Sequence, residues 1–215
     1  MPKLTFAELR ENYTQGGLLE SEALPCPFAM FEKWFEQALA LNILEANAMS
    51  LASADAEGRP SLRMVLLKDL TKDGFSFFTN YESRKGRELD ANPHAALCFH
   101  WKELERQVRA TGLVHRLDTA QSEAYFRQRP RPSQIGAWVS AQSSVIPSRE
   151  TLDRARRQIE EEYADREIPM PPHWGGYILE PLEIEFWQGR PGRLHDRLLY
   201  SKEDNNQWRI SRLSP

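Results

Sequence analysis

The sequence predicts a mainly β protein of the α+β class, in which helices flank an antiparallel barrel or sandwich. Short runs of apolar and β-branched residues recur along the chain, and turn signals such as Glu57-Gly58 and Asn92-Pro93 separate them. In other segments the apolar residues return at helical spacing. Short strands at such intervals, joined by tight turns, are typical of antiparallel barrels and sandwiches.

The expected strands cover residues 48–54, 62–68, 75–79, 95–101, 107–117, 177–187, 194–200 and 208–213. Lys72-Asp73-Gly74 and Asp204-Asn205-Asn206 supply turns between neighbouring strands. The expected helices cover residues 28–41, 83–90, 119–128 and 148–164. Pro27 suits a first helical turn, and Asp118 or Thr119 suits an N-cap. The charges of the last helix predict a solvated face without a function.

Composition and charge limit the functional class. The chain has 215 residues with 40% hydrophobic and 27% charged residues, and its net charge of −3 argues against a general polyanion binder. No apolar run could span a bilayer and no signal core opens the chain, so we expect a cytoplasmic protein. Cys26 and Cys98 form neither a disulfide scaffold nor a metal motif, and Cys98 is expected to be buried. We expect a mobile arm over residues 1–24, with a short helix near residues 6–13, and a single domain over residues 25–215.

The densest group of functional residue types lies in residues 183–200, EIEFWQGRPGRLHDRLLY. Arg193, His195 and Arg197 follow one another at intervals of two residues and are therefore expected to share one face of a strand, because strand side chains alternate. Such a face would carry fixed positive charge and a group that titrates near neutrality. The alternative is a solvated edge strand whose charges prevent aggregation. Spacing alone leaves both open.

Two further segments suit anions. RMVLLK (63–68) brackets an apolar strand with Arg63 and Lys68, which face opposite ways in an ideal strand and need anionic partners or water. In residues 79–86, Arg84 and Lys85 occupy the first turn of a helix, where basic side chains oppose the helix dipole. An anion bound at that N-terminus would remove the conflict, whereas the alternative is a solvated basic helix start.

Residues 125–144, YFRQRPRPSQIGAWVSAQSS, combine groups that bind phosphate. Tyr125 and Arg129 are four residues apart on a helix that Pro130 and Pro132 should end, and Ser133 follows. These hydroxyl and guanidinium groups would suit a phosphate, although a capped helix with a polar loop is the alternative. The chain lacks the glycine-rich nucleotide motifs, the HExxH zinc motif and the GxSxG hydrolase motif. Together these features favour a phosphorylated cofactor that carries the chemistry.

The chain resembles the pyridoxine (pyridoxamine) 5′-phosphate oxidases, flavin enzymes of vitamin B6 metabolism. The resemblance runs from about Arg10 to Pro215 and is carried by RMVLLK, FFTNYESRKG, ERQVRATG, YFRQRPRPSQIGAWVSAQSS and IEFWQGRPGRLHDRLLY. It implies an FMN-binding split β-barrel of antiparallel Greek-key type and a homodimer with FMN at the interface. The implied reaction oxidises pyridoxamine or pyridoxine 5′-phosphate to pyridoxal 5′-phosphate, with O2 as acceptor and H2O2 as product. No metal, nucleic acid or membrane partner is implied.

The resemblance also assigns roles to residues of this chain. The flavin would be bound by Arg63, Met64, Val65, Leu66, Leu67, Lys68, Phe78, Thr79, Arg84, Lys85, Gln107, Gln142, Ser143, Trp187 and Arg197. The substrate would be bound by Arg10, Tyr13, Lys68, Tyr125, Arg129, Ser133, Arg193, Leu194 and His195. Arg193 and His195 would act as the catalytic pair near the reacting carbon, while Arg10 and Tyr13 would belong to a lid. The chain departs from the family at Asn12, where an acidic residue is usual, and at Phe78, where tyrosine is common.

Two other functions share part of this pattern. A related flavin oxidase of the phenazine-biosynthesis type would keep the flavin residues but need not keep Lys68, Tyr125, Arg129 and Ser133. A non-catalytic carrier of FMN or pyridoxal phosphate would keep phosphate contacts but could lose Arg193 and His195. The chain retains both sets, which favours the vitamin B6 oxidase.

Overall fold

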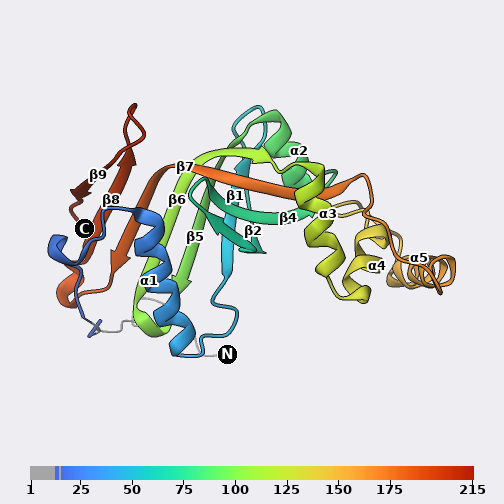
Figure 1. Cartoon of the computed structure of the whole chain (residues 1–215), viewed down its shortest axis with the longest axis horizontal. Coiled ribbons are helices and arrows are strands. Elements are labelled where there is room, and N and C mark those ends of the chain that lie inside the picture. The colour runs from blue at the N-terminus through green and yellow to red at the C-terminus, as the bar shows by residue number, and fades with distance from the viewer. Residues whose placement is uncertain (1–12, 15) are drawn as a thin grey trace, which may run out of the picture. The chain divides into compact units, whose positions relative to one another are not determined.

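The computed structural model describes residues 13, 14 and 16–215, which form two compact units. The first unit comprises the described residues up to Ala46, Cys98–Ala110 and Leu182–Pro215, and the second comprises Asn47–Leu97 and Thr111–Pro181. Strands β5 (His94–Trp101), β6 (Arg106–Arg116) and β7 (Trp174–Gln188) contribute residues to both units (Figure 1).

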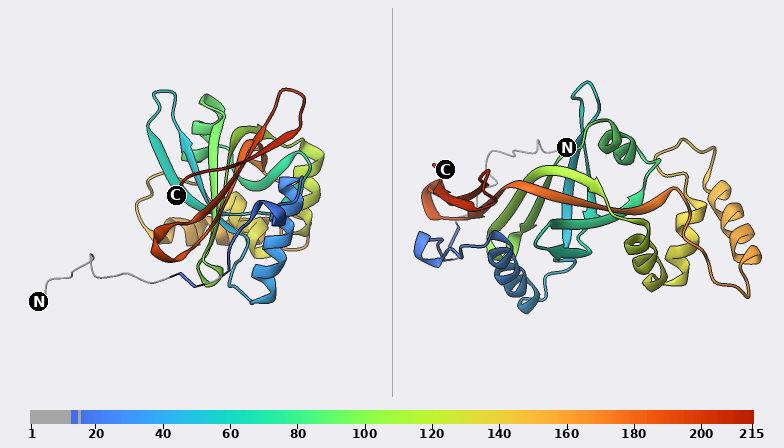
Figure 2. Two further views of the ribbon diagram at one scale, coloured as in Figure 1. Left: turned by 90° about the vertical axis from the view of Figure 1, so that its left-hand side faces the viewer. Right: turned by 45° about the horizontal axis from the view of Figure 1, so that its top comes forward.

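The second unit contains the complete strands β1 (Ala48–Ala54), β2 (Pro60–Leu66), β3 (Asp69–Thr71) and β4 (Gly74–Asn80). The strand order is β2-β1-β5-β6-β7-β4-β3, and β1 and β2 form the antiparallel hairpin drawn in cyan in Figure 2. Met49, Leu51 and Ser53 of β1 are buried at every second position, the pattern of a strand with one buried face. The β3–β4 turn requires Gly74, whose φ is +147° and whose added Cβ would lie 1.9 Å from the carbonyl oxygen of Leu179.

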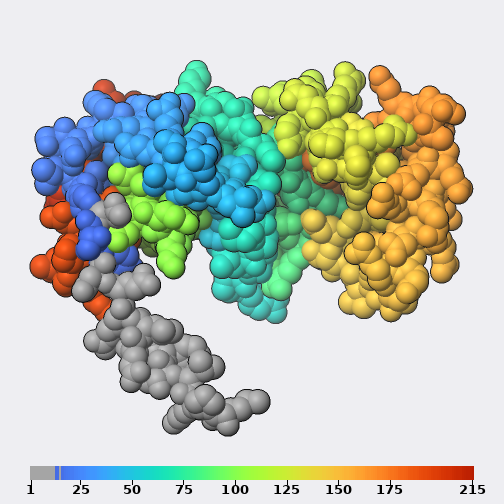
Figure 3. Space-filling view, turned by 90° about the horizontal axis from the view of Figure 1, so that it is seen from below, coloured from blue at the N-terminus to red at the C-terminus, as the bar shows by residue number. Residues whose placement is uncertain are grey.

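The helices of the second unit are α2 (Arg84–Ala91), α3 (Thr119–Gln128), α4 (Arg131–Val139) and α5 (Arg149–Glu162). Ser83 caps α2, because its side chain accepts a hydrogen bond from the backbone N–H of Gly86 at 3.2 Å. Asp118 and Gln121 form a capping box at the start of α3. Helices α4 and α5 pack side by side, and their yellow and orange surfaces adjoin in Figure 3.

The first unit contains α1 (Pro27–Ala40), β8 (Asp196–Lys202) and β9 (Trp208–Arg212), together with short 3-10 turns at Glu20–Glu22, Lys102–Leu104 and Pro191–Arg193. Helix α1 buries one apolar face: the ring of Phe31 lies 4.8 Å from that of Phe99, and the ring of Trp34 lies 5.2 Å from that of Phe186. Strand β8 pairs with β7 and β9 in antiparallel register. Asp196, at its start, accepts hydrogen bonds from the backbone N–H of Leu18 and from Arg212.

The predicted order of helices and strands is confirmed, and so is the mainly β architecture with antiparallel pairing. Asp118 is the N-cap of α3, and Arg84 and Lys85 begin α2 as expected. The expected short helix near residues 6–13 lies outside the described residues, and so do Arg10 and Asn12. Tyr13 is described. Within the described part of the chain, no helix combines the length and apolarity that a membrane span requires.

One prediction about residues 183–200 is wrong. Strand β8 begins at Asp196, so Arg193 and His195 precede it and do not share a strand face with Arg197. The cause is the Pro191-Gly192-Arg193 turn, in which Gly192 and Arg193 adopt positive φ values of 65° and 63°. A left-handed residue cannot continue a strand, and therefore the alternation of side chains starts later than the sequence suggested.

Other boundaries also differ from the predictions. Strand β2 ends at Leu66, so Lys68 follows it rather than closing it, and α3 ends at Gln128, so Arg129 lies just beyond the helix. Helix α4 and the short strand β3 were not predicted. The two prolines do end α3, but Pro132 also fits the first turn of α4, where no backbone N–H is needed. Cys98 is half-buried rather than buried.

Candidate functional site

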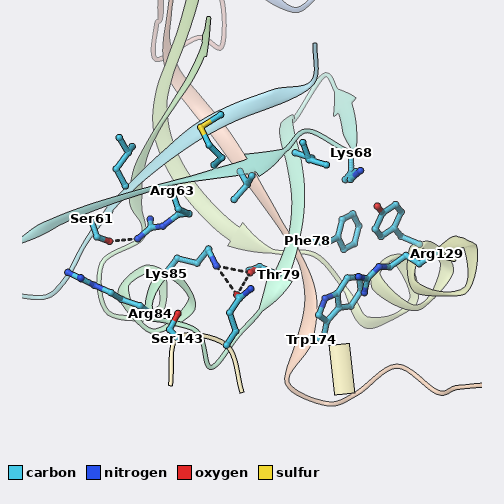
Figure 4. Close-up of a pocket in the computed structure, with 16 residues that line it drawn as sticks. Ser61, Arg63, Lys68, Phe78, Thr79, Arg84, Lys85, Arg129, Ser143 and Trp174 are labelled. Carbon is cyan, nitrogen blue, oxygen red and sulfur yellow. Dashed lines mark hydrogen bonds between the residues drawn. The ribbon is translucent and has the colours of Figure 1, made fainter. Parts of the chain in front are cut away.

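A pocket of about 580 Å³ opens in the second unit (Figure 4). It is lined by Ser61, Leu62, Arg63, Met64, Val65, Leu66, Lys68, Phe78, Thr79, Arg84, Lys85, Tyr125, Arg129, Gln142, Ser143 and Trp174. Figure 4 shows Arg63, Arg84 and Lys85 toward one end and Lys68 and Arg129 toward the other. The pocket therefore has two cationic ends, joined by the apolar side chains of β2 and by Phe78.

Glu88 organises the first cationic end, although it does not line the pocket. It is 5% exposed, and its carboxylate accepts hydrogen bonds from Arg84 Nε at 2.8 Å and from Arg63 Nη2 at 3.3 Å. Ser53 and Ser61 donate to the same carboxylate. Burial opposes ionisation of Glu88, but these hydrogen bonds and the charge of Arg63 lower its pKa to about 2. Glu88 is therefore ionised and fixes both arginines.

Lys85 is the cation at this end whose hydrogen-bond partners, among the residues that the structure describes, are all neutral. Its side chain is 8% exposed, and Nζ donates to Gln142 Oε1 at 2.8 Å and to Thr79 Oγ1 at 3.1 Å. Burial and the nearby charge of Arg63 lower the pKa of Lys85 to about 8. A buried ammonium without a bonded carboxylate favours an incoming anion, which argues against the solvated helix start that the sequence left open.

The charges at this end match a phosphate dianion. Arg63, Arg84 and Lys85 carry three positive charges and Glu88 carries one negative charge, which leaves a net charge of two positive units. A phosphate monoester carries up to two negative charges at neutral pH. The N-terminus of α2 lies at the same place, and the positive end of its helix dipole favours the same ligand.

The second cationic end is built on stacked aromatic rings. The ring of Phe78 lies 4.0 Å from that of Tyr125 and 5.4 Å from that of Trp174, with both pairs nearly parallel. The guanidinium carbon of Arg129 lies 4.6 Å from the centre of the Trp174 ring. Its Nη1 atom is buried and has no hydrogen-bond partner within the described residues. An anion in the pocket would supply that missing partner.

A second group of the expected residues lies in the first unit. The ring of His195 lies 4.6 Å from that of Trp187 and 5.3 Å from that of Tyr13. His195 Nδ1 accepts a hydrogen bond from the backbone N–H of Arg190 at 3.1 Å. Burial and the charge of Arg193 lower the pKa of His195, so the imidazole is neutral at pH 7. These contacts fix the ring with its Nε2 atom as the remaining donor.

Arg197 is also held in the first unit by a buried carboxylate. Glu185 is 5% exposed and accepts hydrogen bonds from Arg197 at 2.8 and 3.0 Å, and Arg109 donates to the same group. Burial opposes ionisation of Glu185, but the two arginines lower its pKa. Glu185 thus fixes Arg197 and Arg109 in the first unit, as Glu88 fixes Arg63 and Arg84 in the second.

The structure brings most of the expected flavin and substrate residues of the second unit into one pocket. Leu67 is buried beside it without lining it, and Ser133 lies in the first turn of α4, outside the lining. Leu194 is exposed, and Gln107 is half-buried in the first unit. Arg10 lies outside the described residues. The roles of these residues remain those that the resemblance implies.

Sequence reasoning missed Ser61, Leu62 and Trp174 in the lining and Glu88 behind it. Glu88 had one available signal, because it follows Arg84 by four residues on a helix, the spacing of a helical ion pair. Trp174 had none, since its role depends on contacts with a distant part of the chain. Among the described residues, no cluster of histidine, cysteine, aspartate or glutamate could bind a metal ion.

Comparison with known proteins identifies the family of this chain. Residues 35–163 match the family described as pyridoxamine 5′-phosphate oxidase, and residues 174–215 match the region described as pyridoxine 5′-phosphate oxidase C-terminal dimerisation region. A pyridoxine/pyridoxamine 5′-phosphate oxidase from Nostoc punctiforme is 57% identical over 98% of this chain and 99% of its own length. Another from Burkholderia vietnamiensis is 54% identical over 98% of this chain and 99% of its own.

Solved structures show the same fold. The crystal structure of PhzG from Burkholderia lata, in complex with tetrahydrophenazine-1-carboxylic acid, has a TM-score of 0.87 at 30% identity and covers 94% of this chain and 99% of its own. A pyridoxamine 5′-phosphate oxidase-related, FMN-binding protein from Nostoc punctiforme has a TM-score of 0.69 at 18% identity and covers 86% of this chain and 97% of its own. The fold is thus the split barrel of flavin-binding proteins, and the dimerisation region supports a homodimer. The chain belongs to the pyridoxine/pyridoxamine 5′-phosphate oxidase family of flavin oxidoreductases.

Proposed function

We propose that this protein oxidises pyridoxine 5′-phosphate and pyridoxamine 5′-phosphate to pyridoxal 5′-phosphate, with FMN as cofactor, O2 as electron acceptor and H2O2 as product. The observation that carries the proposal is the pocket with two separate cationic ends. FMN and the substrate each carry one phosphate, so the reaction needs two anion-binding positions near each other. A protein that bound only one phosphorylated ligand would need one.

The end formed by Arg63, Arg84 and Lys85 suits the phosphate of FMN. Its net charge matches a dianion, and the start of α2 adds backbone N–H donors. Gln142 and Thr79 would fix Lys85 through the hydrogen bonds they already make. When bound there, FMN would supply the redox chemistry, accepting a hydride equivalent from the C4′ carbon of the substrate and returning the electrons to O2.

The end formed by Lys68, Tyr125 and Arg129 suits the phosphate of the substrate. Arg129 presents a buried N–H donor that no described residue pairs, and Tyr125 can add a hydroxyl. Binding energy from this remote group would hold the substrate ring in register for reaction at C4′. The resemblance assigns Ser133 to the same phosphate.

Arg193 and His195 are proposed to orient the substrate ring and to stabilise its changing charge. The neutral imidazole of His195, fixed through Nδ1, would present Nε2 as a hydrogen-bond donor. Trp187, Arg197 and Gln107 are proposed as flavin contacts. The resemblance implies FMN at the dimer interface, so either chain of the dimer could supply these residues of the first unit.

A second candidate is oxidation of a phenazine precursor, because PhzG has a closely similar structure. The ligand named in that complex carries a carboxylate and no phosphate. Arg129, whose buried Nη1 atom has no hydrogen-bond partner in the described part of the chain, and Lys68 at the same end of the pocket favour a phosphorylated substrate.

Oxygen consumption tests the proposal directly. The FMN-loaded protein should consume O2 with pyridoxine 5′-phosphate and with pyridoxamine 5′-phosphate, and should form pyridoxal 5′-phosphate and H2O2 in equal amounts. Absence of turnover with both substrates would refute it. Arg193→Ala and His195→Ala should lower turnover while the protein stays yellow. Loss of flavin from both variants would instead make these residues structural.

A further inference from the structure

Trp174 is a pocket residue to which neither the sequence motifs nor the proposed reaction assigns a role. It begins β7, is 6% exposed and lies opposite Asn80 of β4. One face of its ring stacks with Phe78, and the centre of the Phe126 ring lies 5.2 Å from its own in an edge-to-face arrangement. The guanidinium of Arg129 also lies over the Trp174 ring (Figure 4). Trp174 therefore connects the sheet to the cation at the second end of the pocket.

The backbone of Arg129 is fixed by its neighbour. A residue before proline avoids the helical region, and Arg129, which precedes Pro130, has φ −70° and ψ 143°. Helix α3 ends for this reason, and the Arg129 side chain leaves the helix axis. This places the Cα atom but leaves the long side chain with several rotatable bonds.

The side chain of Arg129 lacks the usual means of fixation. In the part of the chain that the structure describes, no ion pair joins it to a carboxylate, and its buried Nη1 makes no hydrogen bond. Burial lowers the pKa of its guanidinium. By contrast, Arg63 and Arg197 are each held by a buried carboxylate. The aromatic faces of Trp174 at 4.6 Å and Phe126 at 5.7 Å are the contacts that hold the guanidinium of Arg129.

An aromatic face differs from a carboxylate in a way that matters for binding. The ring attracts the cation from one side without neutralising its charge or occupying its N–H donors in the ring plane. A carboxylate would hold Arg129 more firmly but would compete with an incoming phosphate for the same donors. An arginine stacked on an indole is thus held in place and remains free to bind an anion.

We propose that Trp174 is the specificity-determining positioning residue of this pocket: its indole face orients Arg129 so that the site selects phosphorylated over non-phosphorylated substrate. This inference rests on the proposed function for the identity of the substrate. Trp174 orients the guanidinium of Arg129 directly. It also helps to hold the ring of Tyr125, because the rings of Trp174, Phe78 and Tyr125 are nearly parallel and pack together. The effect is confined to the phosphate of the ligand.

The test compares two non-reactive ligands that differ only in the phosphate, 4-deoxypyridoxine 5′-phosphate and 4-deoxypyridoxine. Their dissociation constants are measured by calorimetry on the FMN-loaded protein. Trp174→Met keeps an apolar side chain but removes the ring face, and should lower the preference for the phosphorylated ligand about tenfold. Trp174→Phe keeps a face and should retain most of the preference. The affinity for 4-deoxypyridoxine should be unchanged in both.

Trp138→Met is the matched control. Trp138 packs against the apolar cluster that contains Trp174 and Phe126, and it donates a hydrogen bond to the carbonyl of Pro169 without lining the pocket. It should keep the full preference. An unchanged preference in Trp174→Met, or an equal loss of affinity for both ligands, would overturn the proposal, because the residue would then be merely structural.

If Trp174→Met does not fold, tryptophan with increasing fluorination at position 174 alone tests the same point. Fluorine weakens the negative ring face with little change of shape, so the preference should fall stepwise, and a constant preference would overturn the proposal.

The proposed function can fail separately. The wild-type protein could prefer the phosphorylated ligand and yet consume no O2. That result would refute the oxidase activity, and the variants would still decide the role of Trp174. Wild-type protein that shows no preference for the phosphorylated ligand would overturn this inference even if turnover is observed.

Discussion

The affinity of the protein for FMN should fall as pH rises through the titration of Lys85. The pKa of this lysine is lowered to about 8 by burial and by the charge of Arg63, and the hydrogen bonds that its ammonium makes to described residues go to neutral groups. A phosphate bound beside it would favour the charged form and return the pKa toward its ordinary value. Binding of FMN is therefore coupled to protonation of Lys85, and raising the pH opposes binding.

The size of the effect follows from the two pKa values. With a pKa of about 8 in the free protein, Lys85 is mostly protonated at pH 7 and mostly neutral at pH 9. If the bound form titrates near the ordinary value of about 10.4, the dissociation constant should rise about tenfold between pH 7 and pH 9. This corresponds to about 1.4 kcal/mol of binding free energy. The phosphate itself titrates near pH 6 and contributes little in this range.

Quenching of flavin fluorescence on titration with the flavin-free protein measures the dissociation constant at each pH. Riboflavin, which lacks the phosphate, is the control ligand and should show no such slope. Lys85→Met should bind FMN more weakly at pH 7 and should also show no slope. A pH-independent affinity of the wild-type protein for FMN, or the same slope in Lys85→Met, would refute the coupling.

Two further predictions concern a buried carboxylate and a tight turn. Glu88→Asp keeps the charge but shortens the side chain, so it should release Arg84 and weaken FMN binding about fivefold without changing riboflavin binding. Asp90→Asn on the same helix is the control. An equal loss of affinity for both flavins would contradict the prediction. Gly74→Ala should lower the free energy of unfolding in urea by about 2–4 kcal/mol, because its Cβ would meet a backbone carbonyl at 1.9 Å. Gly58→Ala, which also has positive φ but open space around the Cβ, should cost only about 1 kcal/mol, and equal losses at the two glycines would contradict the steric explanation.

The sequence predicted most of the elements because each carries a local signal. Helix α1 shows helical spacing of apolar residues with Pro27 in its first turn, and α3 begins at the predicted Asp118 cap. The basic residues at the start of α2 pointed to an anion site, and the pocket there supports that expectation. Signals of this kind act within one turn of helix or one strand, so they need no knowledge of the rest of the chain.

The errors arose where distant contacts or backbone strain decide the structure. The positive φ of Arg193 delays the start of strand β8, and nothing in the residue type predicts it, because such a conformation is rare for arginine. Helix α4 starts directly after a helix that two prolines end, a case that local rules treat as a loop. The roles of Glu88 and Trp174 come from contacts with other segments, which neither spacing nor composition reveals.

The two buried carboxylates have a consequence for acid tolerance. The pKa of Glu88 is lowered from its ordinary 4.5 to about 2, and that of Glu185 is also lowered. A carboxylate with a lowered pKa stabilises the folded state fully above its ordinary pKa, and this contribution is lost as pH falls toward the lowered value. Each carboxylate also orients an arginine proposed to bind flavin, Arg63 in one unit and Arg197 in the other. Acid strong enough to release these arginines therefore also removes part of the stability of the fold, so flavin loss and unfolding should occur over the same range of pH.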